Sequence, residues 1–263
     1  MDRPKDIDEY KKWLEREFFV IINSKIENHY NSIAKKIKSD FEVSKVWSDI
    51  LIELDNYNTE YLAKTNYQLF VNSNKPELVL KSFNSFLEKS FRKNIVNNKN
   101  FPMPPDSGWV LPSNWIENTN DILRTFFVVK YLDGVEFLME KLKKCIERNS
   151  LKFQNHFEAR DEGYYAVHLY TIFDFEVPMM NWDTEIQSIS VELQITTQLQ
   201  EVIGKLTHQL YEGRRIINNK SQKKWQWDYE SEEFTGNYLG HILHYVEGMI
   251  MDVRNKQSRK NKI

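Results

Sequence analysis

Cationic residues recur at helical spacing in one segment of the sequence. Residues three or four positions apart share one side of a helix, and four polar residues have that spacing: Lys81, Ser85, Lys89 and Arg92. Ammonium and guanidinium groups neutralise a polyphosphate and donate hydrogen bonds to its oxygens. The segment is therefore a candidate polyphosphate site. The alternative interpretation is a solvated basic face of a helix.

A carboxylate stands at the start of the next strongly apolar segment. Asp121 and Arg124 flank the entrance to Leu123–Leu132, whose β-branched and aromatic residues are typical of a buried strand. Proteins commonly hold Mg²⁺ with one or two carboxylates together with phosphate oxygens. Asp121 is thus a candidate metal ligand, or alternatively it caps a turn in the sequence NTND.

A glycine precedes a second aromatic strand that carries a histidine. Gly163 permits a turn, and the alternation of a strand then places Tyr164, Ala166 and His168 on one face. A tyrosine ring beside a histidine and Arg160 can stack on a base while the cations meet phosphates. The alternative is a half-buried aromatic strand with one hydrogen-bonded histidine.

A third strand carries two polar residues on one of its faces. Glu192 and Gln194 point the same way, while Val191, Leu193 and Ile195 fill the other face. Two polar side chains on an otherwise core-like strand need either solvent or a binding site. The pattern leaves both possibilities open.

Composition narrows the class of protein. The 263 residues are 41% hydrophobic and 28% charged, with a mean hydropathy of -0.62 and no apolar run long enough to span a membrane. The N-terminus lacks the apolar core of a secretory signal. The single Cys145 excludes a disulfide framework and a multi-cysteine metal site. The net charge of -2 gives no overall basic field for nucleic acid. We expect a cytoplasmic globular protein without a membrane segment.

The first part of the chain is predicted to be helical. Apolar residues spaced by three or four positions occupy Tyr10–Ile37, and a second such run occupies Val46–Tyr61 after Ser44, a suitable N-cap. The helical pattern returns from Glu77 to about Asn94. Residues 97–120 are rich in asparagine and proline, and they are expected to form a long loop.

The rest of the chain alternates between strand and helix patterns. Strands are expected at Leu123–Leu132, Tyr164–Val177 and Ile189–Thr196. Helices are expected at Val135–Arg148, Gln198–Tyr211 and Tyr238–Val253. Asp133 and Gly134 are expected to form a turn. Helices packed on a mixed sheet of few strands make an α+β fold.

The order of the four polar segments resembles the RelA/SpoT nucleotide pyrophosphokinase (alarmone synthetase) domain. The family's motifs are Arg-x-Lys-Ser-x-x-Ser-x-x-x-Lys, Asp at the first strand, Asn-Gly-Tyr-x-Ser-x-His and Glu-x-Gln-x-Arg-Thr. They correspond here to VLKSFNSFLEKSFRK, DILRTFFVV, EGYYAVH and VELQITT. The resemblance covers roughly residues 76–215, and four motifs in the right order and context make chance agreement a poor explanation.

The resemblance implies roles for individual residues. Those implied to bind ATP are Lys81, Ser85, Lys89, Arg92 and Arg124. Those implied to bind the acceptor are Arg160, Tyr164 and His168, with Tyr164 stacking on its base. Those implied to be catalytic are Asp121, Glu192 and Gln194. Asp121 and Glu192 would hold Mg²⁺, and Glu192 would help to deprotonate the acceptor hydroxyl. Gln194 would orient the acceptor ribose or the second carboxylate.

The resemblance also implies a fold, a division of the chain and a reaction. It implies an α+β nucleotidyltransferase-like fold with a mixed sheet of about five strands. Residues 1–75 would be an N-terminal helical region, 76–215 the synthetase domain and 216–263 a C-terminal helical extension. The family's hydrolase half would be missing. The implied reaction moves pyrophosphate from ATP to the 3′-hydroxyl of GDP or GTP and leaves AMP.

Four positions depart from the family motifs, so alternatives remain open. The family's Arg, Asn, Ser and Arg are replaced here by Val79, Glu162, Ala166 and Thr196. One alternative is a toxin-type member that pyrophosphorylates the 3′ end of tRNA and needs an antitoxin or another regulatory protein. Another is a decayed module that senses nucleotides or binds a protein without turnover. Self-association into a homo-oligomer is a further expectation.

Overall fold

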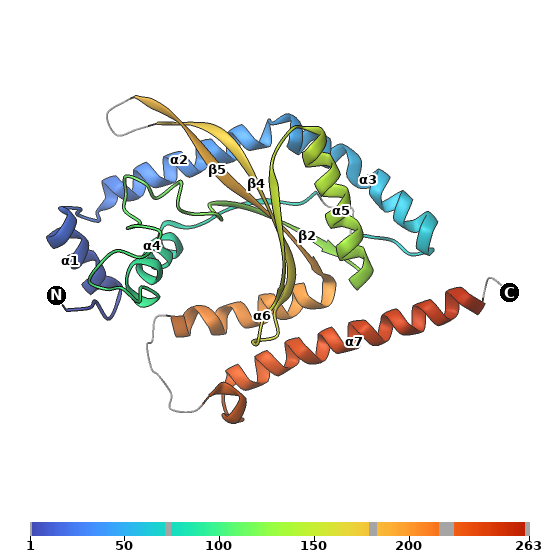
Figure 1. The fold of residues 1–263 in the computed structure, drawn as a ribbon. Coiled ribbons are helices and arrows are strands. Elements are labelled where there is room, and N and C mark those ends of the chain that lie inside the picture. Colours follow the sequence, from blue (N-terminus) through green and yellow to red (C-terminus); the bar gives the residue numbers. More distant parts are fainter. Residues whose placement is uncertain (1, 72–74, 179–182, 216–223, 261–263) are drawn as a thin grey trace. The chain divides into compact units, whose positions relative to one another are not determined.

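The computed structural model describes residues 2–71, 75–178, 183–215 and 224–260 (Figure 1). The chain divides into two compact units. The first unit contains residues 1–43, 78–124 and 172–192. The second contains residues 44–77, 125–171 and 193–263.

A five-stranded mixed sheet is the central element of this α+β fold, as the sequence predicts. The strands are β1 (Leu78–Leu80), β2 (Leu123–Val129), β3 (Phe153–Ala159), β4 (Tyr165–Pro178) and β5 (Thr184–Thr197). They are hydrogen-bonded in the order β1-β2-β5-β4-β3. Strands β2, β4 and β5 contain residues of both units. Among the described helices, none combines the length and apolar content needed to cross a membrane.

Three helices and one π-helical turn belong to the first unit. They are α1 (Ile7–Phe18), α2 (Ser24–Glu42), α4 (Phe83–Phe91) and η1 (Arg92–Val96). Helix α4 packs against both α1 and α2, and α2 also contacts β1. The fully buried Tyr10 of α1 donates or accepts a 2.7 Å hydrogen bond with Ser90 of α4, and its ring lies beside Phe91. This contact fixes α4, which carries the candidate cation Lys89.

The longer helices of the second unit pack in pairs. The helices of this unit are α3 (Lys45–Thr65), α5 (Leu132–Arg148), α6 (Gln198–Arg215), the 3₁₀ turn η2 (Trp225–Trp227) and α7 (Glu232–Lys260). Helix α3 packs on α5, and α6 packs on α7 (Figure 1). Helix α7 also contacts α5, where Arg254 forms an ion pair with Asp133 and donates a 2.9 Å hydrogen bond to the Tyr61 hydroxyl.

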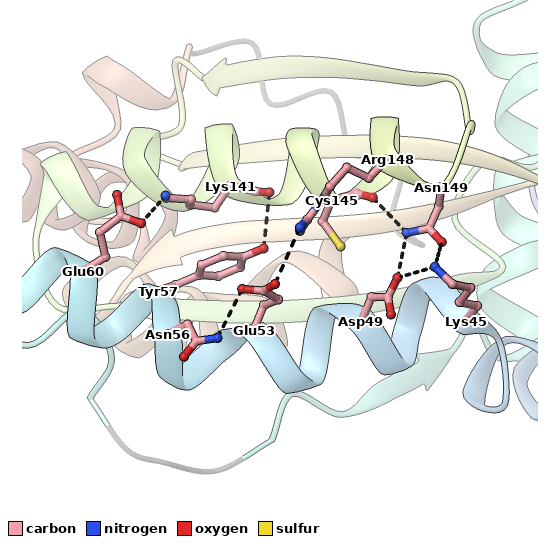
Figure 2. Close-up of polar contacts among 10 residues, drawn as sticks. All are labelled: Lys45, Asp49, Glu53, Asn56, Tyr57, Glu60, Lys141, Cys145, Arg148 and Asn149. Atoms are coloured by element: carbon pink, nitrogen blue, oxygen red, sulfur yellow. Dashed lines mark hydrogen bonds and ion pairs between the residues drawn. The ribbon is translucent and has the colours of Figure 1, made fainter.

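Polar contacts join α3 to α5 along their length (Figure 2). Lys141 of α5 forms an ion pair with Glu60 of α3. At the other end, the Asn149 side chain donates a 3.0 Å hydrogen bond to Asp49 of α3 and another to the Cys145 carbonyl oxygen. Because apolar residues such as Tyr57 and Leu142 are buried nearby, these polar groups line the edge of a hydrophobic interface. The two helices are therefore held by packing and by polar contacts together.

Several predicted helices and strands differ from the structure. The run Tyr10–Ile37 is not one helix, because α1 ends at Phe18, the next residue Phe19 is left-handed (φ 56°), and Asn23 caps the start of α2. The segment Glu77–Asn94 is wrong at its beginning, because β1 occupies residues 78–80. Asp133 and Gly134 lie in the first turn of α5 rather than in a separate turn.

Other predictions agree with the structure. Ser44 caps α3, with its hydroxyl accepting a 3.2 Å hydrogen bond from the Trp47 amide. Residues 97–120, all of them described, form turns without helix or strand. The polar strand β3 was not expected from the sequence. The predicted division into residues 1–75, 76–215 and 216–263 remains a prediction, and residues 216–223 lie outside the described part of the chain.

Candidate functional site

Backbone pairing at the end of β1 places Lys81 beside Asp121. The Lys81 amide donates a 2.9 Å hydrogen bond to the carbonyl oxygen of Ile122, which precedes β2. The Tyr30 hydroxyl of α2 donates a 3.0 Å hydrogen bond to the Lys81 carbonyl oxygen. Both backbone groups of Lys81 are thereby fixed, and its side chain starts from a defined position next to residue 121.

Ser82 then starts the helix that carries the second lysine. Its hydroxyl accepts a 3.2 Å hydrogen bond from the Ser85 amide, which satisfies one of the free N–H groups at the N-terminus of α4. Ser85 also pairs with Ser82 through the two hydroxyls, 2.9 Å apart. Lys89 follows on α4, held by the packing of Phe86 and Leu87 in the core.

The two lysines meet the carboxylate of Asp121. Lys81 Nζ lies 2.8 Å from Asp121 Oδ2, and Lys89 Nζ lies 2.8 Å from Asp121 Oδ1. The side chains of Lys81, Lys89 and Asp121 are 10%, 26% and 18% exposed. Each carboxylate oxygen therefore has its own ammonium partner in a partly buried cluster, here called the Asp121 cluster.

The charges of the Asp121 cluster and their burial shift the pKa values of its members. Burial raises the pKa of Asp121, but the ammonium groups of Lys89 and Lys81 outweigh burial and bring the pKa down to about 2. Burial lowers the pKa of Lys81, with Asp121 opposing and the charges of Lys89 and Arg124 adding to the decrease. Arg124 is thus close enough to belong to the same positive field.

Two further residues border the Asp121 cluster: Lys93, which the basic segment of the sequence already indicated, and Tyr30, which the sequence did not indicate. Lys93 donates a 2.8 Å hydrogen bond to the Asn118 carbonyl oxygen, and burial together with the charge of Lys89 lowers its pKa. Burial and the charge of Asp121 raise the pKa of the Tyr30 hydroxyl. Lys93 belongs to the same basic segment as Lys89, so its charge was a usable signal. Tyr30 had none, because it is distant in sequence.

Arg92, another of the predicted cations, pairs with a carboxylate other than that of Asp121. It lies at the start of η1, and its guanidinium is 4.0 Å from the carboxylate of Glu88, one turn earlier. Both side chains are about one-third exposed, at 34% and 35%. Arg92 is therefore the most solvent-accessible of the predicted ATP-binding cations whose ion pairs are described.

Glu192 and Gln194 are buried on β5, with 3% and 7% of their surfaces exposed. Strand β5 neighbours β2, the strand that follows Asp121. The apolar residues that alternate with them along the strand are fully buried, as predicted: Val191, Leu193 and Ile195. The polar face of this strand is consequently enclosed rather than exposed to solvent.

The carboxylate of Asp121 in the first unit suits a metal ion whose coordination shell is completed by a bound ligand. Within the described residues, no group of three or more His, Cys, Asp or Glu side chains lies close enough to hold a metal ion. A carboxylate has about four acceptor positions, so Asp121 keeps capacity for a cation beside its two lysines. Mg²⁺ needs only one or two carboxylates when phosphate oxygens complete its shell, so the carboxylate of Asp121 is a donor of a suitable kind.

The second unit holds the predicted acceptor residues at the tip of a β-hairpin. Strands β3 and β4 are antiparallel, with Ala159 opposite Tyr165 and His156 opposite His168. Gly163, at φ 76°, allows the connecting turn, in which the Gly163 amide donates a 2.9 Å hydrogen bond to the Arg160 carbonyl oxygen. The turn begins and ends beside Arg160 and Tyr164.

Arg160, Tyr164 and His168 come together at this hairpin. The Tyr164 hydroxyl lies 3.1 Å from His168 Nε2, and the Arg160 guanidinium lies 5.3 Å from the centre of the Tyr164 ring. His168 is 6% exposed, whereas Tyr164 is half-buried. An aromatic ring, a cation and an imidazole in contact form a group that can bind a base and its phosphates.

Two partners of this group were not predicted. Glu158 accepts a 2.9 Å hydrogen bond from Arg160 Nε, and this contact lowers the pKa of Glu158 and raises that of Arg160. Tyr170 places its hydroxyl 3.3 Å from His168 Nδ1. Strand alternation could have found Tyr170, which shares the face of His168 two residues later. Glu158 lies on the unpredicted β3.

Comparisons with known proteins show what the fold is similar to. A GTP pyrophosphokinase family protein from Streptococcus pneumoniae matches at a TM-score of 0.53 and 14% identity, covering 96% of each chain. The small alarmone synthetase 1 of Bacillus subtilis bound to its product pppGpp matches at a TM-score of 0.53 and 16% identity, covering 85% of this chain and 99% of that one. Another structure of that synthetase covers 96% and 99%, at a TM-score of 0.51 and 15% identity.

The comparisons confirm the resemblance at the level of the fold. The chain has the fold of these synthetases along most of its length, with the low identity of a divergent relative. No protein-family model matches the sequence, and no curated protein matches it.

Proposed function

We propose that this chain is a pyrophosphokinase that transfers pyrophosphate from ATP to the 3′-hydroxyl of a guanosine nucleotide, GDP or GTP, as in (p)ppGpp synthesis. The observation that carries the proposal is the Asp121 cluster, in which Lys81 and Lys89 hold one carboxylate. The fold shared with proteins described as alarmone synthetases agrees with it. The B. subtilis synthetase binds pppGpp, which is the product class proposed here.

The donor side of the reaction requires charge neutralisation. ATP carries negative charge along its phosphates, and Lys81, Lys89 and Arg124 supply a local excess of positive charge. The ammonium groups now bound to Asp121 would turn toward phosphate oxygens, while the Ser85 hydroxyl near the start of α4 adds a donor. Arg92, more exposed, would contact the outer phosphate.

The transfer step itself needs alignment more than covalent chemistry from the protein. The acceptor 3′-oxygen forms a bond to the β-phosphorus of ATP, the bond from that phosphorus to the oxygen bridging the α-phosphate breaks, and AMP leaves. Glu192 would take the proton of the hydroxyl. Asp121 and Glu192 are the residues that would hold Mg²⁺, which when bound neutralises charge on the phosphate oxygens.

The acceptor side is assigned to the β3–β4 hairpin. The Tyr164 ring would stack on the base, and Arg160, which lies against that ring, would meet acceptor phosphates. His168, bonded to the Tyr164 hydroxyl, would hold the ring in place or contact a phosphate itself. Gln194 would orient the ribose.

The test is incubation of the purified chain with labelled ATP, Mg²⁺ and either GDP or GTP. A 3′-pyrophosphorylated nucleotide and AMP are expected in equal amounts. Asp121→Asn and Glu192→Gln should each lower the rate by about a hundredfold or more, because each removes charge stabilisation at the reacting phosphates. Asp106→Asn and Glu185→Gln, which change exposed carboxylates in the same unit, are the matched controls.

Other outcomes would distinguish the alternatives. Label transferred to tRNA but not to GDP or GTP would replace the proposed acceptor with the toxin-type one. Nucleotide binding without AMP formation for any acceptor would indicate the decayed module. Equal rates for wild type, Asp121→Asn and Glu192→Gln would contradict the assignment of the site.

A further inference from the structure

The turn that carries the acceptor residues lies in direct contact with the backbone of α7. Gly163 and Gly240 face each other so closely that a Cβ on Gly240 would overlap the Gly163 carbonyl oxygen and lie 3.0 Å from its carbonyl carbon. A Cβ on Gly163 would likewise overlap the Asn237 carbonyl oxygen. Two glycines therefore allow this approach, and any side chain at either position would push the turn and the helix apart.

The side chain of His241 ties both arms of the turn to the same helix. His241 Nε2 lies 2.8 Å from the Asp161 carbonyl oxygen, and Nδ1 lies 2.8 Å from the Tyr165 hydroxyl. Because a carbonyl oxygen only accepts, Nε2 donates the proton and the Tyr165 hydroxyl donates to Nδ1. Asp161 and Tyr165 flank Gly163 and Tyr164, so one imidazole spans the turn.

Further contacts fix α7 in this position. The His244 ring stacks on the Tyr165 ring, with centroids 3.7 Å apart and planes at 7°. The Gln200 side chain of α6 donates a 3.3 Å hydrogen bond to the Gly240 carbonyl oxygen. The turn is consequently held against a helix that itself contacts α6, in addition to the backbone hydrogen bonds within the turn that join Arg160 to Gly163 and Tyr164.

We propose that α7 is part of the acceptor site. Gly240 and His241 are positioning residues, which determine the positions of the Tyr164 and Arg160 side chains. The inference rests on the proposed role of Tyr164 in binding the acceptor. Neither positioning residue need touch the nucleotide, since each acts through the backbone of residues 161–165. Displacement of α7 at this point would move the stacking ring and weaken acceptor binding without changing the Asp121 cluster.

The decisive variant is Gly240→Ala, and the chain offers a matched control in Gly248→Ala. Both substitutions replace glycine by alanine within α7, so both gain the same helix propensity. A Cβ at Gly248 meets nothing within 4 Å, whereas one at Gly240 displaces the turn. His241→Ala is the second variant, since it only removes atoms and creates no overlap.

Kinetics give the first readout. Gly240→Ala and His241→Ala should raise the KM for GDP by about tenfold to a hundredfold and leave the KM for ATP unchanged, because a displaced group misaligns only the substrate it holds. Gly248→Ala should behave as wild type. Equal increases in both KM values, or no increase in either variant, would overturn the inference.

A second readout does not depend on activity. The Tyr164 hydroxyl contacts His168 Nε2, so movement of the ring changes the imidazole resonances of His168, one of six histidines in the chain. The resonance is assigned by its loss in His168→Gln. It should shift in Gly240→Ala and His241→Ala but not in Gly248→Ala.

The two readouts separate failure of this inference from failure of the proposed function. If wild type transfers no pyrophosphate, the proposed function fails, and the His168 resonance still decides whether α7 positions the turn. If Gly240→Ala does not fold, as judged by circular dichroism, His241→Ala decides. A His168 resonance unmoved in the folded variants would overturn the positioning role even in an active enzyme.

Discussion

The Asp121 side chain has two ammonium partners, one on each oxygen. Such a carboxylate is stabilised by charge and destabilised by burial, and the balance can be read from its pKa of about 2, below the ordinary 3.8. The pairs are not exposed surface contacts, because Lys81 and Asp121 are 10% and 18% exposed. Their contribution should therefore be measurable in the stability of the chain.

Asp121→Asn should flatten the acid dependence of stability. A carboxyl whose folded pKa is depressed stabilises the fold above its unfolded value, and that stabilisation is lost as pH falls from about 4 to about 2. The shift corresponds to about 2 kcal/mol at neutral pH. Denaturant unfolding over this pH range should show a smaller decline for Asp121→Asn than for wild type.

The exposed carboxylate of Asp106 provides the control for this measurement. Asp106 contacts Asn100 in the turn region of the same unit and has no lysine partner among the described contacts. Asp106→Asn should retain the wild-type decline between pH 4 and pH 2. Identical pH profiles for wild type and Asp121→Asn would show that the two lysines do not stabilise the charged carboxylate.

The sequence identified the residues of the Asp121 cluster, but it did not identify every residue that contacts them. Lys81, Lys89 and Asp121 were singled out by type and spacing, and the structure places them in contact. Their roles toward ATP stay predictions. The partner Tyr30 could not be found, because its contact with Lys81 is made by the packing of α2 against β1, which depends on the tertiary fold.

At the scale of elements, the basic segment of residues 78–93 differs from the helix that its residue spacing predicts. Residues 78–93 have helical spacing, yet residues 78–80 form β1 and the helix starts only after Ser82. A three-residue apolar run fits a strand or a buried helix equally well, and its hydrogen bonding to β2, which depends on the tertiary fold, decides between them. Lys81 and Lys89 therefore meet Asp121 from different elements.

Strand β3 escaped prediction for a related reason. Its sequence FQNHFEA has mostly exposed residues, so it lacks the buried alternation of a core strand. Its place at the edge of the sheet explains this, since only β4 pairs with it. The buried strands β2, β4 and β5 were predictable because their apolar residues had to fill the core.

Ser82 determines where α4 begins, and its removal should be measurable. Ser82→Ala loses the hydrogen bond that the Ser85 amide donates, and we expect the free energy of unfolding to fall by about 1 kcal/mol. Urea denaturation of the variant and of Ser107→Ala, which changes an exposed serine in the loop of the same unit, makes the comparison. Equal stabilities of the two variants would argue against the cap.

At the scale of the whole molecule, the fold is similar to that of known structures although the sequence identity is low. Identities of 14% and 16% accompany coverage of most of both chains. A fold tolerates such divergence as long as the buried positions stay apolar and the order of strands is kept. Residues that bind ligands are not constrained by the fold, so the fold leaves the class of acceptor open.

The balance of charge over the chain favours a small nucleotide over tRNA. The 36 basic and 38 acidic residues give a net charge of -2, whereas binding to nucleic acid depends largely on neutralising many phosphates. A protein that makes six to ten phosphate contacts loses roughly 10³ to 10⁵ in affinity between about 50 and 200 mM salt. GDP has only two phosphates to neutralise, so its binding should respond far less to salt.

Competition between acceptors makes this distinction measurable. When the chain is given labelled ATP with GDP and bulk tRNA together, we expect the label in GDP at every salt concentration, with a decline of less than about tenfold from 50 to 200 mM salt. Tyr164→Ala should reduce that transfer, since it removes the ring proposed to stack on the base. Label appearing in tRNA, with a steep loss as salt rises, would mean that a local basic surface outweighs the net charge and that the acceptor is a nucleic acid.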